Sequence, residues 1–144
     1  MKRQLIYLLL PALLLFNCGS TNSISENTAQ TDVAEEDIVK ITSEKAEYEI
    51  VIIEPGFNTW LASTARPQGY YSQSYMESRN RIFVQAWNSR VLQVNRYDPN
   101  LYEMQIDYRT NIDYGYDLNY KLYNYFIYFQ LTHNQKLSTI IPRI

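Results

Sequence analysis

The sequence predicts a small α+β domain, in which two or three strands pack against two main helices. Three observations support this class: a β-branched apolar run at residues 47–54, and two longer segments, 74–94 and 116–133, whose apolar residues recur at helical spacing. The domain is expected to span residues 44–144, a length typical of one domain with a single hydrophobic core.

The first predicted strand, residues 47–54, reads EYEIVIIE and stops at Pro55-Gly56, a pair typical of turns. It alternates at first and is then continuously apolar, which is typical of a buried strand. Residues 57–65, which include Trp60, predict a short helical turn. Residues 66–69, RPQG, end it.

The clearest helix is expected behind Ser74 and Glu77, which have the spacing of a capping box, where each side chain pairs with a free amide of the first turn. The apolar residues that follow recur at steps of three and four, which places them on one helix face. They are Tyr75, Ile82, Phe83, Ala86, Trp87, Val91 and Val94. The pattern ends before residues 98–100, DPN, another turn signal.

Residues 102–108 alternate between apolar and polar side chains and predict a second strand. Residues 116–133 hold the densest aromatic run. Two apolar faces at helical spacing favour a helix there, although tyrosine also favours strands. The tail, residues 136–144, is expected to add an edge strand.

Residues 1–17 have the layout of a bacterial export signal: a basic start, an apolar stretch and a polar cleavage region. A leucine three places before Cys18, the only cysteine, predicts a lipoprotein in which acyl chains such as palmitate are attached to Cys18. The alternatives are an ordinary secretory signal and an uncleaved membrane helix. The apolar stretch, residues 5–16, is shorter than the ~20 residues that a span needs, and Pro11 interrupts it.

Residues 18–43 are assigned to the lipidated cysteine and a disordered acidic tether. Five acidic residues and no basic one occur in residues 19–37, a composition that cannot form a core. The tether is interpreted either as a spacer that lifts the domain off a membrane or as a mere remnant between signal and domain. From residue 38 onward, eleven basic residues (thirteen less Lys2 and Arg3) face ten acidic ones (fifteen less those five), which predicts no nucleic-acid partner. The expected location is the cell envelope, anchored by lipid in the outer membrane and facing the periplasm.

The strings EYEIVI, PGFNTWL, GYY, RYDPNLY and NIDYGY, with the final PRI, are distributed over almost all of the domain. They resemble an uncharacterised family of small bacterial envelope lipoproteins, a domain of unknown function. The resemblance implies an envelope location and a single domain, and it carries over no catalytic residue.

The sequence predicts no enzyme, no cofactor and no metal. His133 is the only histidine, and a general base or metal site needs further groups beside it. A hydrolase is disfavoured because no nucleophile–base pair can be assembled. Asp107, Asn111, Asp113 and Asp117 have oxygen ligands at the spacing of a calcium loop, but the nearby glycine is misplaced for an EF-hand. The other interpretation is a turn in which Asp113 or Asp117 caps the next helix.

Six arginines and no lysine occur between residues 66 and 109: Arg66, Arg79, Arg81, Arg90, Arg96 and Arg109. Arginine binds carboxylates or phosphates and also stacks on aromatic rings. The internal interpretation has Arg79 and Arg90 stack on tyrosines or pair with Glu103 and Asp107.

A ligand or partner surface is predicted at five residues: Trp60, Arg66, Tyr70, Tyr71 and Tyr114. The function expected from them is that of a non-enzymatic binding or assembly protein of the envelope, which contacts a membrane-protein partner. The alternative is a carbohydrate- or peptidoglycan-binding module that uses the exposed tyrosines.

Overall fold

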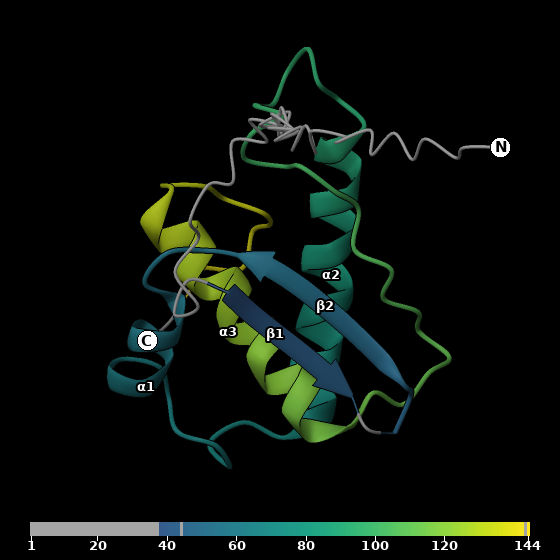
Figure 1. The fold of residues 1–144 in the computed structure, drawn as a ribbon, viewed down its shortest axis with the longest axis vertical. Helices are drawn as coiled ribbons and strands as arrows, with labels where there is room; N and C mark the ends of the chain where they lie inside the picture. The colour runs from purple at the N-terminus through teal and green to yellow at the C-terminus, as the bar shows by residue number, and fades with distance from the viewer. Residues whose placement is uncertain (1–37, 44, 143) are drawn as a thin grey trace, which may run out of the picture. The chain divides into compact units, whose positions relative to one another are not determined.

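The computed structural model describes residues 38–43, 45–142 and 144, and it confirms the predicted α+β class. Two antiparallel strands pack with three helices, two of which are long (Figure 1). In chain order the elements are β1 (Ile38–Ser43), β2 (Tyr48–Ile53), α1 (Phe57–Ser63), α2 (Gln73–Val91) and α3 (Gly115–Thr132). The predicted signal peptide, Cys18 and the tether up to residue 37 lie outside the described residues.

Within the described part of the chain, no helix is both long and apolar enough to cross a membrane.

Strands β1 and β2 form a hairpin in which Ile41 lies opposite Ile50. Strand β1 alternates cleanly, with Val39 and Ile41 buried and Lys40 exposed. Residues 38–43, predicted to belong to the tether, form a strand of the sheet. Apolar and polar residues alternate here over only six residues, next to an acidic stretch. Such a short pattern can be recognised as a strand only once its partner strand is known.

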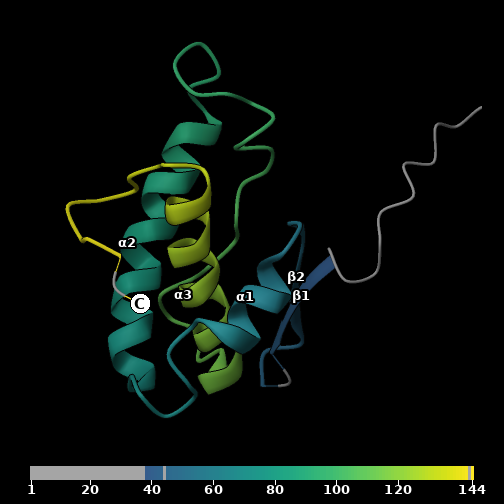
Figure 2. The ribbon, with the colours of Figure 1, turned by 90° about the vertical axis from the view of Figure 1, so that its left-hand side faces the viewer.

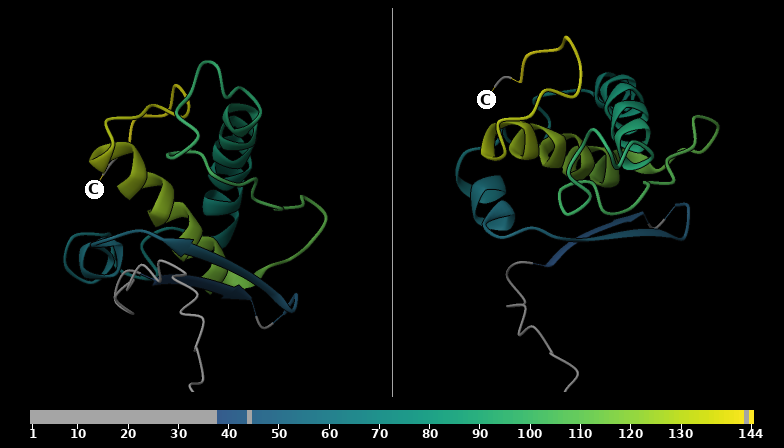
Figure 3. Two further views of the ribbon diagram at one scale, coloured as in Figure 1. Left: turned by 45° about the horizontal axis from the view of Figure 1, so that its top comes forward. Right: turned by 90° about the horizontal axis from the view of Figure 1, so that it is seen from above.

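Helix α3 is the centre of the domain. β1, α1 and α2 all pack against it, and Figure 2 shows α3 between α2 on one side and the hairpin on the other. Figure 3 shows the hairpin as a separate layer, with α1 at one end of it. Apart from Lys121, residues 118–130 are all buried. The helix prediction for residues 116–133 is confirmed, and both of its apolar faces lie in the core, as expected for a helix that is apolar all round.

Helix α2 has a different N-cap from the one predicted. The Ser72 hydroxyl accepts a hydrogen bond from the Tyr75 amide at 3.2 Å, whereas Ser74 lies inside the helix. Glu77 makes no capping bond and accepts one from the Gln73 side chain at 2.8 Å. The capping-box prediction is therefore wrong: it places the N-cap at Ser74, two residues after the observed N-cap, Ser72.

The buried face of α2 is also rotated from the predicted one. The buried residues are Met76, Asn80, Phe83, Val84 and Trp87. Phe83 and Trp87 were predicted, but Tyr75 and Ile82 are exposed, and Val94 lies beyond the helix. A pattern of apolar residues could not include Asn80, whose amide nitrogen is buried against the Asn119 carbonyl oxygen at 3.1 Å.

Residues 102–108 form no strand, so this prediction is wrong. Ile106 is buried, whereas Met104, expected on the same side, is 68% exposed. Side chains of α2 satisfy the backbone of this segment: the Trp87 indole donates to the Met104 carbonyl at 2.9 Å, and the Asn88 amide both donates to and accepts from the Ile106 backbone at 2.8 Å. An extended segment with such partners needs no neighbouring strand.

The predicted edge strand is not found in the described part of the tail, residues 136–142 and 144. Leu137 is nevertheless buried, and its amide donates to the Gln130 side chain at 3.0 Å. Arg90 donates to the carbonyl oxygen of Lys136. Side chains of α2 and α3 thus hold the tail through hydrogen bonds that, in an edge strand, a neighbouring strand would make.

Candidate functional site

Three of the five predicted surface residues lie together in the connection between α1 and α2. The Arg66 guanidinium carbon lies 5.0 Å from the centre of the Tyr70 ring, and the Tyr70 ring meets the Tyr71 ring edge-on at 4.7 Å. Two residues of α2 continue this series of contacts. We call the whole set the Arg–Tyr row: Arg66, Tyr70, Tyr71, Tyr75 and Arg79.

The α2 end of the row is a face-to-face stack. The rings of Tyr71 and Tyr75 are 4.8 Å apart and nearly parallel, at 9°, and the Arg79 guanidinium lies 5.0 Å from the centre of the Tyr75 ring. Tyr75 and Arg79 lie four residues apart, on neighbouring turns of α2, and Tyr71 precedes the N-cap Ser72. Tyr75 and Arg79 were not predicted as surface residues, and this spacing is the signal that could have identified them.

A tight turn positions the exposed end of the row. The Tyr70 amide donates to the Pro67 carbonyl at 3.1 Å, and Gly69 has a φ of 86°, which glycine adopts most readily. The Gly69 amide also donates to the hydroxyl of Tyr116 on α3 at 2.6 Å. This turn leaves Tyr70 57% exposed.

The middle of the row is anchored on the core. Tyr71 is half-buried and meets the ring of Tyr123, a buried residue of α3, edge-on at 5.4 Å. Burial, and secondarily the neighbouring Tyr75 and Tyr71, raise the pKa of Tyr123 well above the usual range of tyrosine. These rings are therefore held in fixed positions rather than free to rotate into solvent.

The two arginines of the row keep most of their hydrogen-bonding capacity. Arg66 donates one bond, to the main-chain oxygen of Ile144 at 2.8 Å. Neither Arg66 nor Arg79 forms an ion pair with any Asp or Glu side chain that the structure describes. The row therefore carries two guanidinium groups that no Asp or Glu side chain within the described domain neutralises.

Trp60 and Tyr114, the other two predicted surface residues, lie elsewhere. Trp60 is half-buried and packs on Phe57 and Tyr128. Tyr114 is only 2% exposed, and its ring packs between those of Tyr48 and Tyr108, so it is not a surface residue. Tyr114 immediately precedes α3, where the hairpin covers its ring, and this packing cannot be read from the turn sequence.

The remaining polar candidates make internal contacts. The His133 ring nitrogen Nε2 lies 3.0 Å from a carboxylate oxygen of Glu54. Asp113 accepts a hydrogen bond from the Gly115 amide at the start of α3, although the N-cap residue is Tyr114, whose own side chain makes no capping bond. Lys45 foremost, followed by the Gly115 amide, lowers the pKa of Asp113 to about 2. Among the described residues, no three His, Cys, Asp or Glu side chains gather where they could hold a metal ion.

Arg79 and Arg90 stack on tyrosines, as the internal interpretation predicted. Arg90 lies over the rings of Tyr97 and Tyr102, at 4.8 and 5.4 Å from their centres. The alternative pairing with Glu103 and Asp107 is not seen, and Asp107 pairs with Arg109 at 2.9 Å. These arginines thus add rigidity to the aromatic packing.

Comparison with known proteins identifies a family but no characterised relative. No curated protein and no solved structure shows significant similarity to the chain. The profile of one family of unknown function matches residues 6–141, nearly the whole chain. This confirms the resemblance to an uncharacterised domain, and it carries no information on a lipid anchor. The chain therefore belongs to the family of unknown function DUF6146.

Proposed function

We propose that the protein is a non-enzymatic accessory protein of the bacterial cell envelope, which binds a protein partner through the Arg–Tyr row. In this proposal a lipid on Cys18 anchors it in the outer membrane, facing the periplasm. The observation that carries the proposal is the unbroken series of ring and guanidinium contacts from Arg66 to Arg79.

The composition of the row supports a protein partner. Tyrosine and arginine are enriched at protein interfaces and among the residues that contribute most to binding. Side chains already stacked on one another lose little conformational freedom on binding, so less of the interaction energy is spent on ordering them. The row combines both properties on one exposed stretch of the chain.

The stacking also favours a protein over a sugar. Sugar-binding aromatic residues need a free ring face, but Tyr71 and Tyr75 cover one face of each other, and guanidinium groups lie over Tyr70 and Tyr75. What remains accessible are the Tyr70 ring, which is 57% exposed, and the in-plane donors of the exposed Arg66, whereas the Nε atom of Arg79 is buried. Such donors match carboxylates, so we expect an acidic partner surface.

Site-specific photo-crosslinking in cells tests this proposal. A photoreactive phenylalanine derivative replaces Tyr70 in one strain and Leu92 in a control strain. Leu92 is 72% exposed and follows α2, about 20 Å along the helix from Arg79, the last residue of the row. We expect a protein adduct of discrete mass from position 70 only, and we expect Arg79→Glu to abolish it.

Adducts of equal yield from both positions, or an adduct that survives Arg79→Glu and Tyr75→Ser together, would contradict the proposal. The glycan alternative predicts a different result, namely cosedimentation with purified peptidoglycan that is lost in Tyr70→Ala/Tyr71→Ala. Tyr97→Ala is the matched control for those variants, because Tyr97 also carries arginines on its ring but lies beyond the other end of α2.

The membrane anchor has its own test. Cys18→Ala removes the acyl acceptor, and two or three acyl chains, at ~0.8 kcal/mol for each buried methylene, would otherwise hold the protein on the membrane almost permanently. We therefore expect the wild-type protein, but not the variant, to carry a palmitate label. We also expect a carbonate wash to release the variant alone. A wild-type protein without the label would exclude the lipid anchor.

A further inference from the structure

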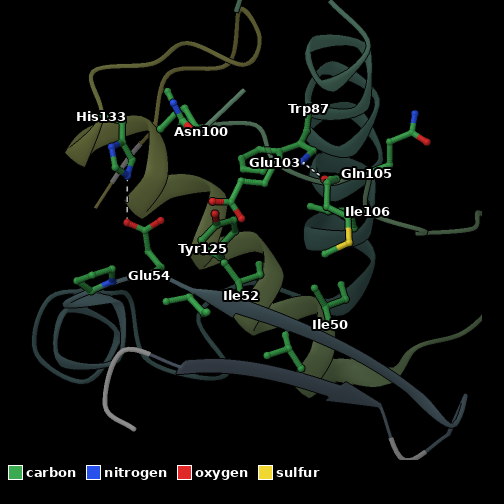
Figure 4. A pocket seen from close by; sticks show the side chains of 15 residues that line it. Ile50, Ile52, Glu54, Trp87, Asn100, Glu103, Gln105, Ile106, Tyr125 and His133 are labelled. Carbon is green, nitrogen blue, oxygen red and sulfur yellow. Dashed lines mark hydrogen bonds and ion pairs between the residues drawn. The ribbon is translucent and has the colours of Figure 1, made fainter. Parts of the chain in front are cut away.

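A second site lies between strand β2 and residues 100–106. Here the structure has an open cavity of about 400 Å³, within the range of small-molecule pockets. Figure 4 shows side chains from the strand, from this segment and from helices α2 and α3 around it. Its apolar walls are formed by Ile50, Ile52, Trp87, Leu101, Met104 and Ile106.

The polar lining of the cavity contains two carboxylates. It includes Glu54, Glu103 and His133, and it contains no lysine or arginine. Glu103 forms no ion pair or hydrogen bond with another described residue, and Glu54 is paired only with His133. Glu103 therefore supplies a carboxylate that no described cation pairs with, and such a group attracts positive charge and repels anions.

Tyr125 is the buried polar group at this site. Its side chain is 2% exposed, it lines the cavity, and its hydroxyl has no hydrogen-bond partner among the described residues. The oxygen is not among the fully buried polar atoms that lack a partner, so it is accessible from the pocket, where a ligand or water can pair with it. Burial, followed by the charges of Glu54 and Glu103, raises the pKa of Tyr125 far above its usual range, which keeps the hydroxyl protonated.

We propose that this cavity binds an organic cation with an apolar body, such as an amine or guanidinium group attached to a hydrocarbon or aromatic moiety. The cation lies between Glu54 and Glu103, beside the Tyr125 hydroxyl. The apolar body lies along Ile52 and Trp87. A neutral ligand of the same shape would leave the carboxylates unpaired and partly desolvated, and an anion would be repelled.

This site is independent of the Arg–Tyr row. The row is cationic and made of residues 66–79, none of which lines the cavity. Failure of the partner proposal would therefore leave the cavity proposal intact, and the reverse also holds.

Three matched probes test the ligand class: 2-phenylethylamine, 2-phenylethanol and 3-phenylpropanoate, which are a cation, a neutral molecule and an anion of similar shape. They are titrated against the lipidated full-length protein in nanodiscs. The chain has two tryptophans, so Trp60→Phe leaves Trp87 in the cavity wall as the only fluorescent reporter. Saturation-transfer NMR on the wild-type protein gives a second readout that does not depend on the folding of this variant.

We expect the amine to bind at least about tenfold more tightly than the alcohol, because bonds to charged groups are the stronger ones, and the propanoate not to bind. Glu103→Gln should remove most of this preference. Glu49→Gln is the matched control, because Glu49 is an exposed residue of β2 outside the lining. Equal affinity for amine and alcohol, an unchanged preference in Glu103→Gln, or no binding of any probe would each overturn the proposal.

Discussion

Gly56 is the position where one methyl group is expected to have the largest calculable effect. It precedes α1 with a φ of 79°, and a Cβ added there would lie 3.0 Å from the Tyr128 hydroxyl. That hydroxyl donates to the Pro55 carbonyl at 2.6 Å. Gly56→Ala therefore combines backbone strain with displacement of a hydrogen-bonded group.

The expected magnitude is the sum of these two effects. The left-handed conformation costs an alanine ~1–2 kcal/mol, and the disturbed hydrogen bond adds ~0.5–1.5 kcal/mol. Gly69→Ala is the matched control: Gly69 has a φ of 86°, but a Cβ there would have no atom within 4 Å. Gly69→Ala should therefore lower the free energy of unfolding by the strain alone, ~1–2 kcal/mol.

Urea unfolding followed by tryptophan fluorescence measures both variants, and an unchanged m-value would show that only stability has changed. In a Tyr128→Phe background the hydroxyl is absent, so the cost of Gly56→Ala should fall to that of Gly69→Ala. The reasoning is refuted if the two glycine variants are equally destabilised in the wild-type background. It is also refuted if Tyr128→Phe leaves the cost of Gly56→Ala unchanged.

Three further predictions concern side chains. Asn88→Ala leaves the amide of the buried Ile106 unpaired and its carbonyl with only the bond from the Tyr108 amide, and should lower the free energy of unfolding by ~1–3 kcal/mol in urea titrations. Lys45 is the main cause that lowers the pKa of Asp113 to about 2. The Asp113 carboxylate therefore stabilises the fold above pH 3.8, and this contribution is lost as the pH falls toward 2. Asp113→Asn should therefore flatten the dependence of stability on pH in this window. Burial raises the pKa of Tyr108 to about 12, so its contribution to stability is complete below pH 10 and is lost as the pH rises toward 12. Tyr108→Phe should reduce this alkaline loss, measured by denaturation at several pH values.

Controls for these variants are available in the same elements. Gln85→Ala, at an exposed position of α2, should have little effect on stability, and an equal effect of Asn88→Ala would exclude a role of Asn88 in holding residues 102–108. An Asp113→Asn variant that follows the wild-type pH profile would contradict the capping and ion-pair contacts of Asp113. An ultraviolet titration in which Tyr108 ionises with the freely exposed tyrosines would contradict its burial.

Helices and strands were predictable where the pattern of apolar residues within their own stretch of sequence is sufficient to identify them. Residues 116–133 carry two apolar faces, so any helix there had to be buried, and the apolar run of β2 is bounded by Pro55-Gly56. The prediction that this strand is buried is wrong, because its residues are half-buried or exposed in alternation. Apolar and polar residues alternate just as regularly in residues 102–108. The backbone of this segment, however, pairs with the side chains of Trp87 and Asn88. Whether an alternating segment pairs with a strand or with a helix is decided by packing that the segment itself does not encode.

The same distinction applies to the sites. Arg66, Tyr70 and Tyr71 are neighbours in sequence beside a turn, so their clustering was predictable. The burial of Tyr114 was not predictable, because the hairpin that covers its ring is distant in sequence. The cavity is built from four separate segments of the chain, and no local pattern could have indicated it.

The position of α3 in the sequence has a consequence for synthesis. The helix on which β1, α1 and α2 pack begins at Gly115 of a chain of 144 residues, so these elements leave the ribosome before the helix that unites them. A two-stranded hairpin alone is marginally stable at best in water, and α2 without α3 exposes its buried face. Domains generally fold as units once their residues have emerged. The nascent chain of this protein therefore completes its core only after α3 has been synthesised.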